Sequence, residues 1–400
     1  MILQDLFPRF DSHSCETGNL LLSGNALLGA EDCFFRMAQE LLSQGSSLLL
    51  ADGHLSSSRR NELLNAADAY GCRVFIFDVD GCNGPAFDLL SLAKTPENAV
   101  DLLYGFWGSS TDEPSMSTII RRYLRDCVLY LADVGREFTA QDILSLCVDD
   151  VLFGLERSGS LCPELIEDEC RFLKAKAVYQ AWGVLNDRTA LLRACGLMDT
   201  ISGRRDASES FYGPALYLVC KKAGSLSAIY PALLNGFLTV VAQSRSAYGS
   251  PRNIWLNGTE AIRRDVLRAV LQSGTLAEDL LPACVYEQSA ANLLNAHGDS
   301  VLNNFSSFGV FQTTEGVFWS SFFGTAPTPE ITQTNSNRRG FFTGNTGGVV
   351  PRSIGRREGT SVRRVEKNLF EPSVFLSLRE KNLVFFNAFT HRRYKKQLRW

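Results

Sequence analysis

Two glycines with the spacing of a phosphate-binding loop lie near the N-terminus. An apolar run over 19–23 leads into Gly24-Asn-Ala-Leu-Leu-Gly29 and then into a helical pattern, which matches the first part of G-x-x-x-x-G-K-[ST]. Such a loop needs a Lys to neutralise the phosphates and a Ser or Thr hydroxyl to hold Mg²⁺. Ala30 and Glu31 occupy these positions, and Asp32 follows. The segment therefore has the placement of a phosphate loop without its ATP-binding groups; a chance glycine pair is the alternative.

The acidic residues that follow the loop also oppose an anionic ligand. A carboxylate about 5 Å from a phosphate charge repels it by about 3 kcal/mol at an effective dielectric near 20, whereas the helix dipole attracts it by about 1 kcal/mol. Glu31 and Asp32 instead stabilise an empty helix N-terminus. We expect no cofactor, with unusually bound ATP and Mg²⁺ as the alternative.

Other polar residues follow predicted strands, at the edge where open α/β sheets bind ligands. The strand 253–256 leads into Asn257, where a phosphoryl-transfer enzyme holds Mg²⁺ with an Asp. Glu260 is either a displaced catalytic carboxylate or a cap of the next helix. Asp52 follows the strand 47–51 and is either a ligand-binding residue or the first residue of a turn. Gln288 follows the strand 283–286.

The charge of the chain is unevenly distributed. Residues 338–400 hold 15 Lys and Arg against 4 Asp and Glu, a net of +11 that leaves −14 for residues 1–337. Basic residues beside aromatic ones suit phosphates and bases, so this end either binds nucleic acid or docks on an acidic surface of the same protein or a partner. The candidates are Arg352, Arg356, Arg357, Arg363, Arg364, Arg392, Arg393, Lys395, Lys396 and Arg399.

Hydrophobic periodicity predicts the elements that position these residues. Strands over 19–23, 47–51 and 73–77 alternate with helices over 30–43 and 58–70, which indicates a parallel sheet covered on both faces. Only helices are predicted over 96–222, among them 139–156 and 163–185. Strands at 237–242, 253–256, 283–286 and 308–312 and helices at 259–272 and 290–296 follow, and 325–360 is predicted to be irregular.

Composition bounds the class of protein. The chain has 400 residues, of which 45% are hydrophobic and 21% charged, and this excludes a disordered or collagen-like chain. No apolar run of about 18 residues and no signal-peptide pattern occurs, so we expect a cytoplasmic protein. The 11 Cys without a Cys-x-x-Cys pair and the 4 His indicate reduced thiols and no metal site.

Taken in order, these segments resemble the motor domain of the TraG/TraD-like coupling proteins of type IV secretion and conjugation, a branch of the FtsK/HerA ATPases. The segments 23–30, 48–54, 71–78 and 85–90 follow the order of the family's phosphate loop and next strands. The segments 253–260, 286–293 and 302–311 match its Asp-Glu strand, its sensor segment with Gln288, and a later strand. The family's Lys, Ser or Thr, and Asp are Ala30, Glu31 and Asn257 here.

The resemblance implies an α/β fold: a P-loop NTPase-like (RecA/FtsK-like), mostly parallel sheet with helices on both faces, interrupted by an all-α domain. The expected parts are 1–95, an inserted helical domain over 96–222, 223–337, and a basic segment over 338–400 with final strands. It also implies a pseudo-ATPase that docks on an active coupling ATPase or secretion-apparatus subunits, in the cytoplasm or peripheral at the inner membrane through a partner. Retained ATP hydrolysis, at a site completed by another subunit, and DNA binding through the basic end are the alternatives.

Overall fold

The computed structural model describes residues 6, 18–78, 81–84, 86–109, 112–135, 137–158, 162–205, 214–221, 229–244, 253–275, 283–339, 354–388 and 392–398. By its contacts the chain forms two compact units, 1–313 with 379–400, and 314–378. The boundaries predicted at 95, 222 and 337 stay predictions.

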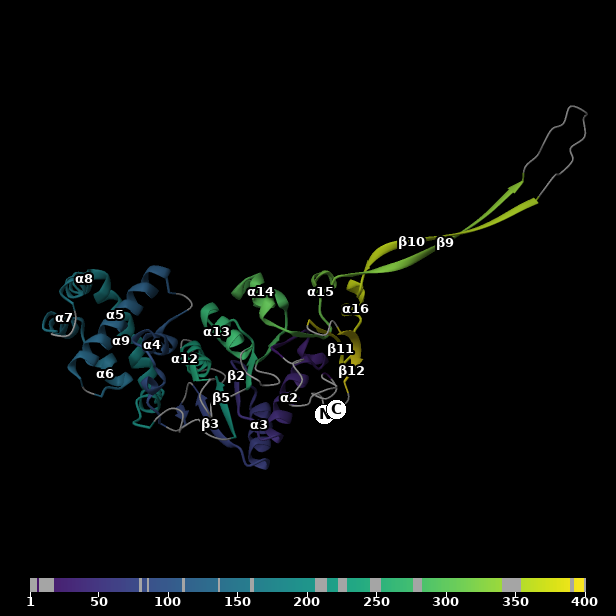
Figure 1. The fold of residues 1–400 in the computed structure, drawn as a ribbon. Helices are drawn as coiled ribbons and strands as arrows, with labels where there is room; N and C mark the ends of the chain where they lie inside the picture. Colours follow the sequence, from purple (N-terminus) through teal and green to yellow (C-terminus); the bar gives the residue numbers. More distant parts are fainter. Residues whose placement is uncertain are drawn as a thin grey trace, which may run out of the picture. The chain divides into compact units, whose positions relative to one another are not determined.

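The first unit is built on a mostly parallel sheet (Figure 1). Its strand order is β12-β11-β8-β1-β7-β6-β2-β5-β3-β4. The strands from β8 to β3 are parallel, and β4, β11 and β12 are joined by antiparallel pairing at the two edges. The bounds are β1 Leu20–Ser23, β2 Leu48–Asp52, β3 Arg73–Asp78, β4 Gly81–Asn83, β5 Ala215–Cys220, β6 Asn253–Asn257, β7 Ala283–Glu287, β8 Ser307–Val310, β11 Asn382–Asn387 and β12 Arg392–Gln397.

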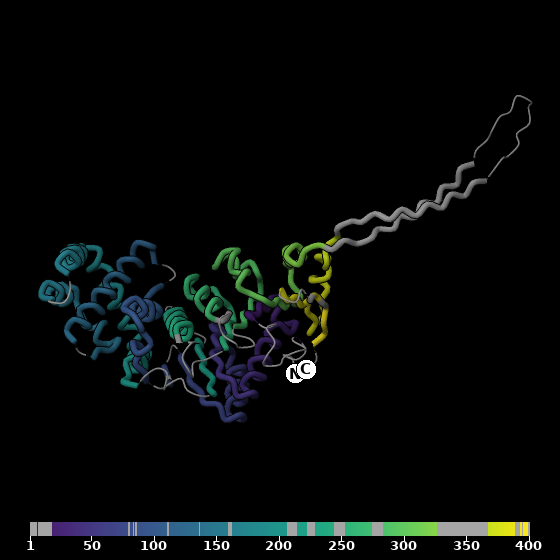
Figure 2. Tube along the Cα trace, viewed as in Figure 1, coloured from purple at the N-terminus to yellow at the C-terminus, as the bar shows by residue number. Residues whose placement is uncertain are grey.

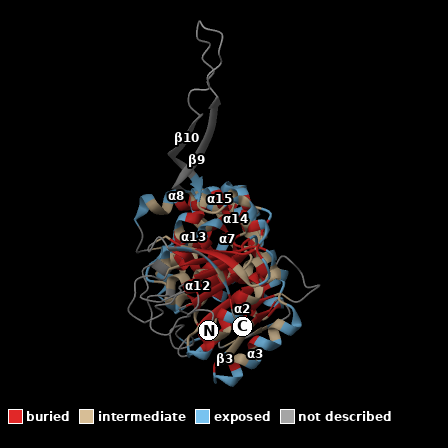
Figure 3. Ribbon diagram, turned by 90° about the vertical axis from the view of Figure 1, so that its right-hand side faces the viewer, coloured by how far each residue is buried: buried red, intermediate tan, exposed pale blue. Residues whose placement is uncertain are grey.

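Helices cover both faces because the central strands are apolar on both sides. On one face, α2 (Ala30–Ser43) and α3 (Ser57–Ala69) share a core with alternate residues of β1, β2, β5, β6 and β7. On the other face lie α12 (Ile229–Ser244), α13 (Arg264–Thr275) and α14 (Ala290–His297). Figure 3 shows the buried strands between these layers. The predicted sheet class and the helix over 30–43 are confirmed.

A set of helices interrupts the sheet between β4 and β5, as the sequence predicted. Phe106 of α4 packs edge-on against Phe237 of α12, with ring centroids 5.4 Å apart, and the Trp107 indole donates to the Thr189 hydroxyl at 2.9 Å. Figure 2 shows these helices in blue and teal, gathered to the left of the purple first strands and the green later elements. The bounds are α4 Pro96–Trp107, α5 Pro114–Val134, α6 Ala140–Ser145, α7 Val148–Glu156, α8 Pro163–Leu173, α9 Lys176–Ala194 and α10 Leu197–Ile201, and the short 3-10 turns are η1 Ala26–Leu28, η2 Leu89–Leu92 and η3 Asp299–Asn304.

Several predicted elements were wrong. The strand predicted over 237–242 lies inside α12, whose buried position between the sheet and α4 leaves it without a polar face. The helices predicted over 139–156 and 163–185 are each broken, by an extended residue at Leu146 and a turn at 174–175. Strand β5 lies in the range predicted to be helical, and α13 begins at Arg264 rather than at 259.

The second unit holds a long hairpin where an irregular segment was predicted. β9 (Thr325–Arg339) pairs antiparallel with β10 (Ile354–Asn368), from Thr325 opposite Asn368 to Arg339 opposite Ile354. At its base, α15 (Gly316–Phe323) and α16 (Pro372–Leu376) bring Phe323 and Phe375 into a stacked pair 5.8 Å apart. The prediction failed because the sequence of β9, rich in Thr, Asn, Pro and Arg, has no apolar alternation that would mark a strand.

No helix among the described residues is long and apolar enough to cross a membrane.

Candidate functional site

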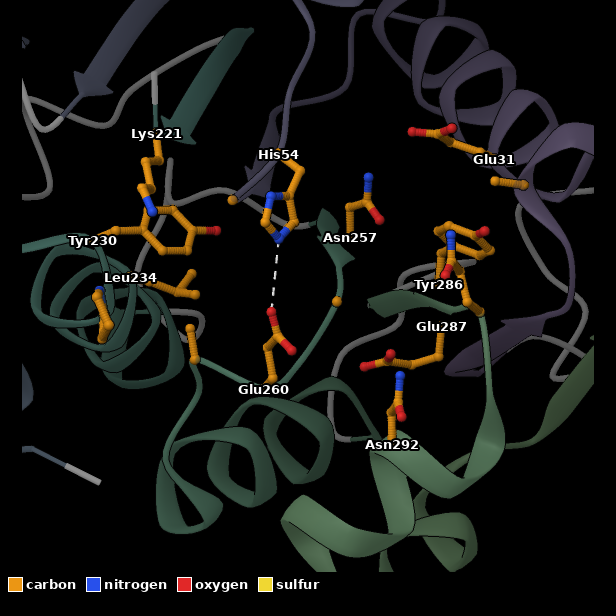
Figure 4. Close-up of a pocket in the computed structure, with 16 residues that line it drawn as sticks. Glu31, His54, Lys221, Tyr230, Leu234, Asn257, Glu260, Tyr286, Glu287 and Asn292 are labelled. Carbon is orange, nitrogen blue, oxygen red and sulfur yellow. Dashed lines mark ion pairs between the residues drawn. The ribbon is translucent and has the colours of Figure 1, made fainter. Parts of the chain in front are cut away.

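A pocket of about 490 Å³ opens at the carboxyl edge of the sheet. The register places the ends of the central strands side by side there: Ser23 beside Glu287, and Asn257 beside Asp52. Figure 4 shows the polar side chains that converge on it from these strand ends and from α2 and α12. The pocket is lined by Ala26, Glu31, Gly53, His54, Lys221, Tyr230, Pro231, Leu234, Asn257, Gly258, Glu260, Ala261, Tyr286, Glu287, Gln288 and Asn292.

The glycine loop, residues 24–29, forms hydrogen bonds within itself and to neighbouring strand ends. It forms the short turn η1 between Gly24 and Gly29. The N–H groups of Leu28 and Gly29 donate to carbonyls of the loop, and that of Leu27 donates to the Asn25 side chain at 2.9 Å. The N–H groups of Gly24 and Asn25 donate to the carbonyls of Glu287 and Gln312. A phosphate loop holds its ligand with such N–H groups, and here they already have acceptors.

Close packing fixes the start of the loop. Gly24 has φ +130°, and a Cβ there would lie 2.9 Å from the carbonyl oxygen of Gln312 and from Cβ of Phe311. Glycine is therefore required at this position for a structural reason, whatever ligand the loop meets.

The two positions after the loop face different surroundings. Ala30 is fully buried in the core under α2, so a Lys at this position would have to displace core side chains. Glu31 lines the pocket and brings a carboxylate to it. Both features oppose the binding of a triphosphate.

Asn257 is held by a carboxylate of the neighbouring strand. Its Nδ2 donates to Oδ2 of Asp52 at 2.7 Å, and Oδ1 of Asp52 accepts the N–H of His54 at 2.7 Å. Burial raises the pKa of Asp52 to about 6, against the lowering effect of these hydrogen bonds. Asp52 thus acts as a buried hydrogen-bond acceptor with two partners. One carboxylate oxygen orients Asn257, and the other accepts the N–H of His54 in the turn that was predicted to follow the strand.

A second buried carboxyl group lies across Asn257 from Asp52. Oε1 of Glu287 accepts both the N–H and the hydroxyl of Thr259, and burial raises the pKa of Glu287 to about 7. Glu287, Lys221 and Tyr230 were not predicted as site residues. Glu287 lies in the segment matched to the family's sensor, but only Gln288 was singled out there, and Lys221 and Tyr230 belong to no motif. Glu287 could have been found by the same reasoning that selected Asp52, because each is the acidic residue that ends a fully apolar strand.

The remaining predicted residues divide between the pocket and other surfaces. Glu260 lies four residues before α13 begins, and its Oε1 is 3.7 Å from Nε2 of His54, with both side chains about 80% exposed. Gln288 lines the pocket. The catalytic or sensor roles of Glu260 and Gln288 stay predictions.

The basic residues of the carboxyl end fall into both compact units. Arg356, Arg357, Arg363 and Arg364 lie on β10, and Arg392, Arg393, Lys395 and Lys396 lie on β12. Arg393 and Lys395 are exposed, and the Arg393 guanidinium lies 5.0 Å from the centre of the Phe386 ring. Arg352 and Arg399 lie outside the described residues.

Metal ligands do not converge in the part of the chain that the structure describes, where no three His, Cys, Asp or Glu side chains are placed to hold an ion. The carboxylates of the pocket are distributed over several walls instead.

Solved structures with a similar fold include a bacterial conjugative coupling protein and VirB4. The unbound monoclinic form of the bacterial conjugative coupling protein TrwBdeltaN70 matches with a TM-score of 0.65 at 14% identity, over 99% of this chain and 91% of that one. TrwB in complex with ADP and Mg²⁺ matches with a TM-score of 0.61 at 15% identity, over 95% and 84%. VirB4 of Thermoanaerobacter pseudethanolicus matches with a TM-score of 0.50 at 10% identity, over 99% and 92%.

No protein-family model matches the chain, and no curated protein matches its sequence. At these identities the structural likeness establishes the fold, and it confirms the P-loop NTPase-like architecture that the order of segments predicted. The chain therefore has the fold of the conjugative coupling protein TrwB.

Proposed function

We propose that the protein is a non-hydrolysing, coupling-protein-like subunit of a type IV secretion or conjugation system. It acts as a scaffold or adaptor in the cytoplasm, where it docks on an active coupling ATPase or on the base of the secretion apparatus and helps to recruit or gate substrate. The fold shared with the conjugative coupling protein TrwB supports the assignment to a type IV secretion or conjugation system. The state of the glycine loop supports the loss of hydrolysis.

The loop is the single observation that carries this proposal. The N–H groups of Leu27, Leu28 and Gly29 donate to acceptors within the loop. The position of the phosphate-binding Lys is the buried Ala30, and Glu31 brings negative charge to the pocket. Because phosphoryl transfer depends on positioning and on neutralising the phosphates, a chain that lacks both cannot turn over ATP at a motor's rate.

Purified full-length protein is expected to show no ATP hydrolysis with Mg²⁺, at a detection limit about a thousandfold below an ordinary enzyme kcat of about 10 s⁻¹. Glu260→Ala is expected to leave this background unchanged. The measurement is phosphate release, with an active coupling ATPase as the positive control. Hydrolysis at an ordinary motor rate that Glu260→Ala abolishes would contradict the proposal and favour the retained enzyme.

Nucleic-acid binding through β12 is a second candidate function, favoured by the exposed Arg393 and Lys395. A random-sequence duplex is expected to bind at low salt and to dissociate steeply as salt rises, since each phosphate contact releases counterions. Replacing both residues by Gln should reduce the slope of log K against log salt by about 2. Arg171→Gln with Lys174→Gln, at exposed positions on α8 and directly after its end, is the matched control. An unchanged slope would exclude β12 as the contact surface.

A further inference from the structure

The pocket at the sheet edge has the chemistry of a site for an organic cation. Its lining includes three carboxyl groups, from Glu31 on α2, Glu260 after β6 and Glu287 at the end of β7. The basic groups of the lining are the Lys221 ammonium and the His54 imidazole, whose Nε2 lies 3.7 Å from Oε1 of Glu260. In Figure 4 the carboxylates of Glu260 and Glu287 face the centre of the pocket, and Lys221 lies at the opposite wall beside Tyr230. The charge of the lining therefore opposes a nucleotide and attracts a positively charged group.

These acids are close enough to act on one another. Burial is the largest cause of the raised pKa values of Glu287 and of Asp52, which lies behind the pocket wall; the charge of Glu260 adds to the first and that of Glu31 to the second. Such mutual repulsion is relieved when a cation enters between the carboxylates.

The Tyr230 side chain is a second observation, independent of the acids. Tyr230 is 7% exposed, and its hydroxyl has no hydrogen-bond partner among the described residues although it points into the pocket (Figure 4). Gly53 packs on the ring: a Cβ at Gly53 would lie 3.0 Å from Cε1 of Tyr230. Since the buried unpartnered side-chain atoms of the described residues do not include this hydroxyl, it is accessible from the pocket, where it offers a donor and an acceptor to a polar group of a ligand.

The distribution of the acids selects among cations. Since the described residues include no group of three side chains placed to hold a metal ion, the carboxylates cannot act as a compact coordination sphere. A volume of about 490 Å³ accommodates a molecule of several heavy atoms with its charge spread over more than one donor. An amine or a guanidinium group meets both conditions, because its several N–H donors can reach carboxylates on different walls.

We propose that this pocket binds an organic cation, through an amine or guanidinium group that contacts Glu31, Glu260 and Glu287 while a polar atom of the ligand pairs with the Tyr230 hydroxyl. The inference rests on the proposed loss of nucleotide binding in the same pocket. The cation is supplied either as a free small molecule or as a Lys or Arg side chain of a partner protein.

Titration calorimetry on the full chain tests this site with arginine amide and spermidine as free cations, and with a capped Gly-Arg-Gly peptide. We expect binding that weakens with salt, and a loss of about tenfold in affinity, equal to about 1.4 kcal/mol, in Glu31→Gln and in Tyr230→Phe. Glu380→Gln, an exposed acid elsewhere on the first unit, is the matched control and should bind as the wild type does. Binding of the peptide as tight as that of arginine amide would identify a partner side chain as the source, and binding of the free cations alone would identify a small molecule.

No binding of any of these probes at millimolar concentration, or an equal loss in Glu380→Gln, would overturn the inference. A parallel titration with ATP and Mg²⁺ separates the two proposals. Nucleotide binding with hydrolysis would contradict the proposed function, whereas absence of both nucleotide and cation binding would contradict the cation site alone.

Discussion

Asn257→Asp, the substitution that restores the missing acid of the phosphoryl-transfer site, is expected to lower the free energy of unfolding by about 2 to 3 kcal/mol and to produce no ATP hydrolysis. The Nδ2 of Asn257 is the donor for Oδ2 of Asp52, 2.7 Å away. An Asp at 257 would replace this hydrogen bond by two buried carboxyl groups in contact. Like charges at this distance cannot both ionise, so the pair must take up a proton or separate.

Chemical denaturation at pH 7 measures the effect, and the double variant Asp52→Asn with Asn257→Asp is its matched control. The double variant exchanges donor and acceptor across the same pair, so it should recover most of the lost stability. Asn257→Asp with wild-type stability and with measurable ATP hydrolysis would show that the site had lost only one residue. The expected result would show instead that Asp52 on the neighbouring strand β2 requires a hydrogen-bond donor at position 257.

The sequence predicted the order of the central elements well because those strands and helices carry strong apolar patterns. α2 has the predicted bounds, and β6 and β7 are each one residue longer than predicted. Strand β5, Ala-Leu-Tyr-Leu-Val-Cys, was missed because a short, wholly apolar run fits a buried helix as well as a strand. The segment 237–242 was misassigned for the same reason, since β-branched residues in a buried helix imitate a strand.

The candidate site was predicted only where a motif or strand end marked it. Glu31, Asn257, Glu260 and Gln288 lie around one pocket, and the order of strand ends had suggested a common sheet edge. Their partners could not be found in this way. The pairing of Asn257 with Asp52 depends on β6 lying next to β2, although the two residues are 205 positions apart. Tyr230 reaches the pocket from α12, a helix whose start the sequence did not reveal.

Two buried carboxyl groups, Glu287 in the pocket lining and Asp52 behind the pocket wall, should make stability fall as pH rises through the neutral range. The pKa of Asp52 is about 6 and that of Glu287 about 7 in the folded chain, against about 3.9 and 4.3 in an unfolded chain. The folded state therefore binds more protons than the unfolded state between these values. The stabilising contribution is complete below about pH 4 and is lost as pH rises through about 6 for Asp52 and about 7 for Glu287.

At about 1.4 kcal/mol for each pKa unit, the full shift corresponds to about 3 kcal/mol for Asp52 and about 4 kcal/mol for Glu287. Relative to the wild type, Asp52→Asn should therefore gain about 3 kcal/mol in the free energy of unfolding between pH 4 and pH 7, and Glu287→Gln a similar amount between pH 4.5 and pH 8. Denaturation curves of variant and wild type at each pH give these differences. The titration of all other groups is common to both proteins and cancels. Glu380→Gln, an exposed control, should show no trend with pH. A constant difference for both variants would mean that the carboxyl groups are already ionised in the fold. The expected trend instead makes the pocket more negative as pH rises through 7, because Glu287 then loses its proton, and cation binding should strengthen over the same interval.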